Sequence, residues 1–304
     1  MPSFSRPLRR FALLTTTLAG LALLVHYLHW DDRAQLWLKE RDTPASARAA
    51  SIWLPGYTAS IQRKPLDGLE EDETSDLAYS PLTGTLFTVT GKLPMLVELS
   101  RTGEVLRRIA LKGFSNPEGV AVLENGKIAV ADERKRNLSI FELTPDTFEL
   151  NITDGNPFDL GFPDAGNKGF EGVAWDPAQQ RLLLGKERSP RLFGLGSDGQ
   201  RLLQSELQPL PSYGLGMRNL SALSVDPRTG HMLALSAQSH LLLELDEQGE
   251  PISFISLIGG QSGLEQRIPR AEGVAMDEEG TIYMVSEPNL FYVFRKSPET
   301  PPRS

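Results

Sequence analysis

Most of the chain alternates short apolar runs with turns rich in Gly, Pro and Asp. Runs such as Leu86 to Val89 and Ile282 to Val285 are each bounded by turn residues, here Pro81 to Gly84 and Glu279-Gly280. This spacing predicts β-strands joined by hairpins. One stretch departs from it, because Phe11 to Leu28 is an uncharged, mostly apolar run that predicts a helix.

The strand pattern occurs five times. Each copy has an opening strand, a turn, a second strand and a third strand that ends in Glu-Leu or a similar pair. An internal period of roughly 40 to 50 residues made only of strands is typical of a β-propeller, whose blades converge on one axis. We therefore predict an all-β fold, a propeller of five four-stranded blades, with six blades as the alternative. The copies open at Ser75, Glu118, Glu171, Ser221 and Glu272.

The ends of the repeat region predict how the ring closes. The fifth copy stops after its third strand, whereas most copies have a fourth, as at Thr102 to Leu106. Thr58 to Leu66 precedes the first copy and offers the missing strand, and pairing it with the last copy would cover two exposed edges. We expect the propeller to occupy residues 56–296, followed by a disordered tail over 297–304.

The N-terminal helix has the features of a membrane segment. A helix over residues 11–28 nearly spans a hydrocarbon core of ~30 Å, and the basic residues before it would stay in the cytoplasm. Thr17-Leu18-Ala19 offers a cleavage site, so a removed signal peptide is the alternative. We predict a single-pass signal-anchor in the inner cell membrane, with a cytoplasmic basic tail over 1–10, a linker containing a short helix over 29–55, and the propeller in the periplasm.

Composition narrows the class of partner. The chain has no cysteine, which excludes disulfides and thiolate sites. Its net charge of -8 argues against a nucleic-acid partner, which would need clustered Lys and Arg. The same charge is compatible with a cation as ligand.

Repeated glutamates predict an acidic ring. Three copies open with Glu-Gly-Val, and residues that face each other across a hairpin have a constant index sum centred on the turn. This places a second glutamate opposite the first in each of the three blades, at one end of the propeller. The expected pairs are Glu118 with Glu133, Glu171 with Glu187, and Glu272 with Glu287.

Six carboxylates around one opening raise each other's pKa unless something compensates. Calcium takes six to eight oxygen ligands in flexible geometry, and the six glutamates, with Ser75 and Ser221 in the other two blades, could supply them. Zinc is less favoured, because neither His231 nor His240 occupies an equivalent position. The alternative without a metal is that the glutamates cap backbone amides and pair with neighbouring cations. The candidate ligand-binding residues are Ser75, Asp132, Arg134, Lys186, Arg188 and Ser221.

The most distinctive segments of the repeats are Glu73 to Tyr79, Glu118 to Ala121, Gly169 to Pro177, Ala271 to Asp277 and Val285 to Tyr292. With these segments the chain resembles the SdiA-regulated (YjiK-like) proteins of Gram-negative bacteria. The resemblance covers roughly residues 57–296 and implies a β-propeller behind an N-terminal membrane segment, with no established biochemical role. The sequence departs from the expected pattern at Asp76 and at Ala237-Gln238, which argues against equal ligation by all five blades.

Two functions fit these features. The first is a non-enzymatic, envelope-anchored propeller that holds calcium at its acidic mouth and binds a small ligand or an envelope protein. The second is a calcium-dependent hydrolase of the lactonase or phosphoesterase type, in which the metal polarises the scissile group or activates water. We favour the first because the pattern places no histidine base at the rim, although Asp132 and Glu133 could act as an acidic dyad.

Overall fold

The computed structural model describes residues 6–27, 30–161, 169–197, 202, 206–212 and 215–296. The chain divides into two compact units, Met1–Asp42 and Thr43–Ser304. The predicted disordered tail over 297–304 and the first half of the predicted basic tail lie outside the described residues.

The first unit consists of helices α1 (Arg6–Tyr27) and α2 (Trp30–Asp42). The window Arg10–Tyr27 of α1 is long and apolar enough to cross a membrane. Within it, the hydroxyl groups of Thr15, Thr16 and Thr17 donate to carbonyl oxygens three or four residues earlier, which satisfies them inside an apolar segment. The predicted linker holds more helix than expected, because it contains all of α2.

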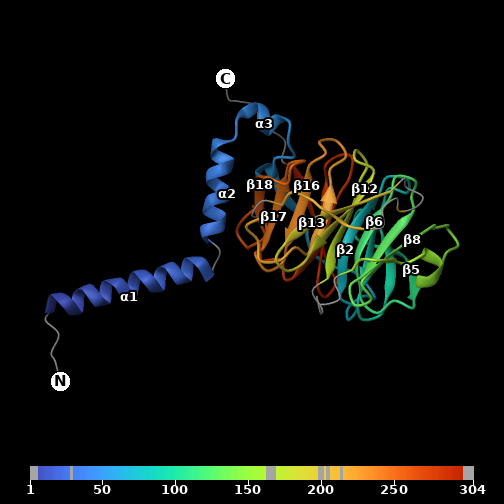
Figure 1. The fold of residues 1–304 in the computed structure, drawn as a ribbon, viewed down its shortest axis with the longest axis horizontal. Helices are drawn as coiled ribbons and strands as arrows, with labels where there is room; N and C mark the ends of the chain where they lie inside the picture. The colour runs from blue at the N-terminus through green and yellow to red at the C-terminus, as the bar shows by residue number, and fades with distance from the viewer. Residues whose placement is uncertain are drawn as a thin grey trace. The chain divides into compact units, whose positions relative to one another are not determined.

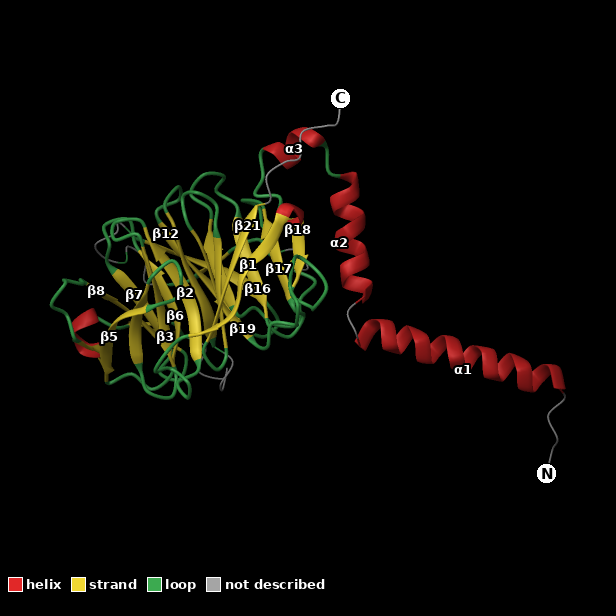
Figure 2. Cartoon of the chain, turned by 180° about the vertical axis from the view of Figure 1, so that it is seen from behind, coloured by secondary structure: helices red, strands yellow, loops and turns green. Residues whose placement is uncertain are grey.

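The second unit is a propeller of five antiparallel sheets among the described residues (Figures 1 and 2). Short α3 (Ala45–Ala49) and the 3-10 turn Leu54–Gly56 precede it. Blade one is β2 (Thr74–Ser80), β3 (Thr85–Thr90), β4 (Met95–Leu99), β5 (Val105–Lys112) and β9 (Glu149–Asn151). Blade two is β6 (Pro117–Val122), β7 (Ile128–Asp132), β8 (Asn137–Phe141) and β10 (Phe158–Asp159), and blade three is β11 (Phe170–Asp176), β12 (Arg181–Lys186), β13 (Arg191–Gly196) and β14 (Gln208–Pro209). Blade four is β15 (Ala222–Val225), β16 (Met232–Ser236), β17 (Leu241–Leu245) and β18 (Pro251–Ser256), and blade five is β19 (Ala271–Met276), β20 (Ile282–Ser286), β21 (Leu290–Lys296) and β1 (Tyr57–Pro65).

Blade five joins the two ends of the repeat region, which confirms the predicted closure. Strand β1 pairs antiparallel with β21, from Tyr57 opposite Lys296 to Pro65 opposite Leu290, and Figure 2 shows the two strands side by side. Blade one differs from the prediction, because β9 adds a fifth strand parallel to β5.

The segment before β1 is fastened to blade four by one buried carboxylate. Glu244 accepts hydrogen bonds from the backbone N–H groups of Ile52 at 2.7 Å and Trp53 at 3.0 Å. His231 Nδ1 lies 2.7 Å from the same carboxylate, and the Ser253 hydroxyl donates to it at 2.5 Å. The side chain of Glu244 is fully buried, so these contacts replace the water that it gives up.

The inner strands β2, β6, β11, β15 and β19 form a closed ring, each in contact with the next. Glycine is required where they approach most closely. A Cβ on Gly119 would lie 2.9 Å from the backbone oxygen of Glu171, and one on Gly273 would lie 2.6 Å from the backbone carbon of Asp76. The glycine of each Glu-Gly-Val motif therefore lets adjacent inner strands pack together at the axis.

Candidate functional site

Each Glu-Gly-Val glutamate lies at a β-bulge at the start of its inner strand. In blade two, Pro117 pairs with Asp132 and Gly119 pairs with Ala131, so Glu118 is the extra residue between them. The same register shift occurs between Phe170 and Gly172 and between Ala271 and Gly273. The predicted direct pairing of glutamates across each hairpin is therefore wrong, because a bulge shifts the ladder and re-aims the side chain.

The second set of glutamates nevertheless lies at the same end of the blades. Glu133, Glu187 and Glu287 each follow the last residue of the second strand. Their backbone N–H groups donate to the carbonyl oxygens of residues just before the inner strand, at 2.9 to 3.1 Å. All six predicted glutamates thus lie at one end of the propeller axis, which we call the mouth.

Three of the six carboxylates form a tight cluster. One oxygen each from Glu133, Glu171 and Glu187 lies within 4.8 Å of the others. Glu133 accepts a hydrogen bond from the backbone of Gly169 at 3.0 Å, and Glu187 pairs with Arg188 at 3.4 Å. Among the described residues, the carboxylate of Glu171 has neither a hydrogen bond nor an ion pair. The cluster therefore contains one carboxyl group, that of Glu171, that no described side chain compensates.

Burial and mutual repulsion disfavour the ionised forms at the mouth. Burial first, then the charges of Glu272 and Glu187, raise the pKa of Glu171 to about 11. Burial and nearby glutamates also raise the pKa of Glu118 to about 8 and that of Glu272 to about 7. Ser75 and Ser221, two of the predicted ligand-binding residues, act in the opposite direction. Their hydrogen bonds to Glu118 and to Glu272 lower the pKa values of those two glutamates.

Blade five shows the ion pairing expected in the absence of a metal. The guanidinium of Arg270 lies 3.6 Å from Glu272 and forms a closer ion pair with Glu287. Burial raises the pKa of Glu287, and the charge of Arg270 opposes that effect. The mouth is therefore uneven, with compensated carboxylates in blade five and an uncompensated one in blade three.

The remaining predicted ligands lie at or near the mouth with different roles. Asp132 is buried and accepts hydrogen bonds from the backbone of Ser115, Asn116 and Lys135, so its carboxylate holds a turn. Arg134 is exposed on the turn after β7, and Lys186 ends β12. We infer that Asp132 supports the mouth by holding this turn in place.

Asp76 lies close to the propeller axis, and the Glu-Gly-Val pattern predicted no role for it. It occupies the blade-one position equivalent to Gly119, adopts a left-handed φ of 45° and is fully buried. Its carboxylate accepts hydrogen bonds from the backbone N–H groups of Leu77, Val120 and Val173 at 2.9 to 3.0 Å. Burial raises its pKa well above the usual value, against the lowering effect of these bonds. An acidic residue at a glycine position of the repeat is the signal that identifies it.

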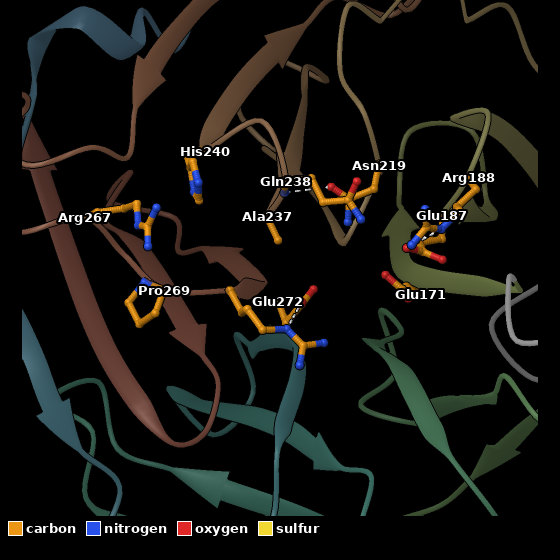
Figure 3. Close-up of a pocket in the computed structure, with 11 residues that line it drawn as sticks. Glu171, Glu187, Arg188, Asn219, Ala237, Gln238, His240, Arg267, Pro269 and Glu272 are labelled. Carbon is orange, nitrogen blue, oxygen red and sulfur yellow. Dashed lines mark hydrogen bonds and ion pairs between the residues drawn. The ribbon is translucent and has the colours of Figure 1, made fainter. Parts of the chain in front are cut away.

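A cavity of about 370 Å³ opens beside the cluster (Figure 3). Figure 3 shows Glu171 and Glu187 on one side of it and His240 and Arg267 on the other. The expectation that no histidine lies near the rim is therefore wrong. The other residues lining it are Arg188, Asn219, Ala237, Gln238, Pro269, Arg270 and Glu272.

Comparison with solved structures finds similar chains at low sequence identity. One belongs to a nidogen/laminin complex, with 17% identity, a TM-score of 0.45, and coverage of 71% of this chain and 72% of that one. Another is a catalytically inactive virginiamycin B lyase from Staphylococcus aureus, with 10% identity, a TM-score of 0.42, and coverage of 73% and 65%. The model of the SdiA-regulated family matches residues 49–295, which spans the whole propeller. The chain therefore belongs to the SdiA-regulated family.

Proposed function

We propose that the mouth of this propeller binds calcium and, through it, a small ligand or an envelope protein, without catalysing a reaction. The observation that carries the proposal is the cluster of Glu133, Glu171 and Glu187, whose oxygens lie within 4.8 Å of one another. A divalent cation among them would offset the burial and the repulsion that raise the pKa of Glu171.

The donor atoms favour calcium over other divalent ions. Carboxylate and hydroxyl oxygens are hard ligands, which suit Ca²⁺, Mg²⁺ and Mn²⁺ better than Zn²⁺ or Cu²⁺. The glutamates come from different blades and have long, adjustable side chains. Such a set suits the variable coordination of calcium better than the strict octahedron of magnesium.

Helix α1 supplies the proposed location. Its window Arg10–Tyr27 is long and apolar enough to span a bilayer, and the preceding segment is basic. An anchor of this kind in the inner membrane would orient its basic end to the cytoplasm and the propeller to the periplasm. The proposed function is thus that of a membrane-anchored, calcium-binding receptor or adaptor of the cell envelope.

A calcium titration followed by thermal melting tests the cation site. Calcium at 100 times its Kd should stabilise the full-length protein by about 2.7 kcal/mol, or roughly 5 to 10 °C for a domain of this size. Glu171→Gln should abolish the rise, whereas Glu247→Gln, which alters an exposed glutamate elsewhere, should keep it. An equal rise in wild type and Glu171→Gln would exclude the cluster as the site.

Hydrolysis remains a second candidate because His240 lines the same cavity as Glu171 and Glu187. A neutral imidazole beside a metal-bound water could act as a general base. A panel of lactones, aryl esters and phosphoesters, assayed with calcium present, separates the two functions. Turnover that is lost in both His240→Gln and Glu171→Gln would establish the hydrolase and overturn the binding function.

A further inference from the structure

Blades one and four lack the glutamate pair, and the space that this leaves is filled in one blade and open in the other. Blade one has Ser75 and Gly91 at the two positions, and blade four has Ser221 and Ala237. Small residues in a ring of large ones leave space unless a neighbour fills it. What occupies that space decides where a ligand could enter.

In blade one the space is filled. A Cβ on Gly91 would lie 3.1 Å from the side-chain oxygen of Asn116. The amide of Asn116 is held there because it donates to Glu118 at 2.7 Å and to Glu133 at 3.1 Å. This side of the mouth is therefore closed by protein.

In blade four the space stays open as the cavity of about 370 Å³. Ala237 lines it at the position where blades two, three and five have glutamate. This volume lies at the small end of the range of ligand pockets, about 300–1,000 Å³. The gap in the acidic ring is thus a pocket of small-molecule size next to the proposed cation.

The pocket presents hydrogen-bond donors opposite the carboxylates. The side chains of Gln238 and Arg267 line it and, among the described residues, neither has a hydrogen-bond or ion-pair partner. Arg188 and Arg270 also line it but are paired with glutamates. Arg267 therefore supplies the positive charge that the protein itself leaves uncompensated.

The segment that carries Arg267 is anchored. It connects β18 to β19, and Ile268 within it is fully buried and donates its backbone N–H to the carbonyl oxygen of Leu257 at 3.0 Å. Leu264 is also buried, and its carbonyl oxygen accepts from Gly260 at 2.7 Å. A fixed loop places the guanidinium at the pocket without a large ordering cost.

We propose that the blade-four cavity binds a small organic acid, which lies between the cation at the glutamate cluster and the guanidinium of Arg267 and is attracted by both. The inference rests on the proposed cation site, because the cation reverses the charge on the acidic side of the cavity. Without that cation, the carboxyl groups of Glu171, Glu187 and Glu272 would offer an anion no positive charge on that side of the cavity. A carboxylate and a phosphate or phosphonate share the required chemistry.

Isothermal titration calorimetry on the full-length protein in detergent micelles tests this. The probes are phenylphosphonate and benzoate, with benzyl alcohol as the uncharged match. Calcium-loaded wild type should bind at least one of the anions and not the alcohol, and the metal-free protein should bind neither. The tighter anion identifies the acidic group of the natural ligand.

Two variants test the assigned residues. Arg267→Gln should weaken anion binding at least tenfold, whereas Arg295→Gln, an exposed arginine at the far end of β21 from the mouth, should leave it unchanged. Ala237→Glu restores the glutamate of the other blades, fills the cavity and should abolish anion binding. The calcium-dependent rise in melting temperature, measured on every variant, reports whether the cation site is intact.

The outcomes separate the two proposals. Absence of a calcium effect in wild type would overturn the cation site and this inference with it. A calcium effect without anion binding, or equal anion affinity in wild type and Arg267→Gln, would overturn the inference alone. Anion binding that is the same without calcium would exclude a position between the cation and Arg267.

Discussion

One carboxylate oxygen of Asp76 in blade one accepts a hydrogen bond from the backbone N–H of Val173 in blade three, at 3.0 Å. The same oxygen accepts from Val120 in blade two, also at 3.0 Å. Val120 and Val173 lie two residues after Glu118 and Glu171. A single side chain therefore ties together the strands that present glutamates from blades two and three.

Replacing Asp76 should destabilise the propeller. In Asp76→Asn, one acceptor oxygen becomes an NH₂ donor facing backbone N–H groups, and each buried donor left unpaired costs about 1–3 kcal/mol. We expect a loss of about 3 kcal/mol or more in urea unfolding at neutral pH. Asp67→Asn, at an exposed position, is the matched control. A loss no greater than that of the control would show that Asp76 does not tie the strands.

Adding a methyl group at the axis should strain the inner ring. In Gly119→Ala the new carbon would lie 2.4 Å from a methyl of Val173 and 2.9 Å from the backbone oxygen of Glu171. We expect a cost of about 1–3 kcal/mol, because the neighbouring strand must shift. Gly194→Ala, whose added carbon would meet nothing closer than 3.4 Å, should change the unfolding free energy much less. Similar unfolding curves for the two variants would contradict the close-packed ring.

The stability of the metal-free protein should fall as pH rises. Carboxyl groups whose pKa is raised on folding, to about 8 at Glu118 and about 7 at Glu272, stabilise the folded state fully below the unfolded value near 4.5. That contribution is lost as pH rises through the folded values. In the proposed cation site calcium competes with protons for the carboxyl oxygens of Glu171, whose pKa is raised to about 11, so its effect on the melting temperature should grow from pH 5 to pH 8. A calcium effect that is larger at pH 5 would contradict this linkage.

The buried contact of Glu244 should protect the segment before β1. Glu244→Gln removes the charge that holds the N–H groups of Ile52 and Trp53 and that pairs with His231. Losing a buried charge from such a pair costs about 3–5 kcal/mol. Limited proteolysis should then cut the chain near residues 50–55 sooner than in wild type, while exposed Glu247→Gln keeps the original rate.

The repeats predicted the architecture because equivalent positions in a propeller meet at one axis. The five copies of the strand pattern were enough for the number of blades, and the unfinished last copy was enough for the closing strand. The three Glu-Gly-Val motifs indicated that Glu118, Glu171 and Glu272 lie at the same end. These features depend on the period of the sequence and on the topology, both of which can be read along the chain.

Local geometry at the mouth could not be read in the same way. Residues that face each other across a hairpin have a constant index sum only if the two strands pair without a bulge. The bulge at Glu118 adds one residue to its strand but leaves the apolar pattern of the sequence unchanged. The open space at Ala237 and the filled space at Gly91 look alike in sequence, because only the position of Asn116 separates them. In the sequence Asp76 is recognisable only as an acidic residue where other copies of the repeat have glycine. The three hydrogen bonds that its carboxylate accepts depend on its left-handed backbone conformation, which the sequence does not show.

The pairing of β1 with β21 also governs the order of folding. Among the described strands β1 is made first and its partner β21 is made last, so a nascent chain carries an unsatisfied sheet edge until β21 emerges. Contacts between such distant positions form slowly. The ring therefore becomes a cooperative unit only once β21 has been made, and a chain that lacks β21 would keep an open sheet edge and be prone to aggregation.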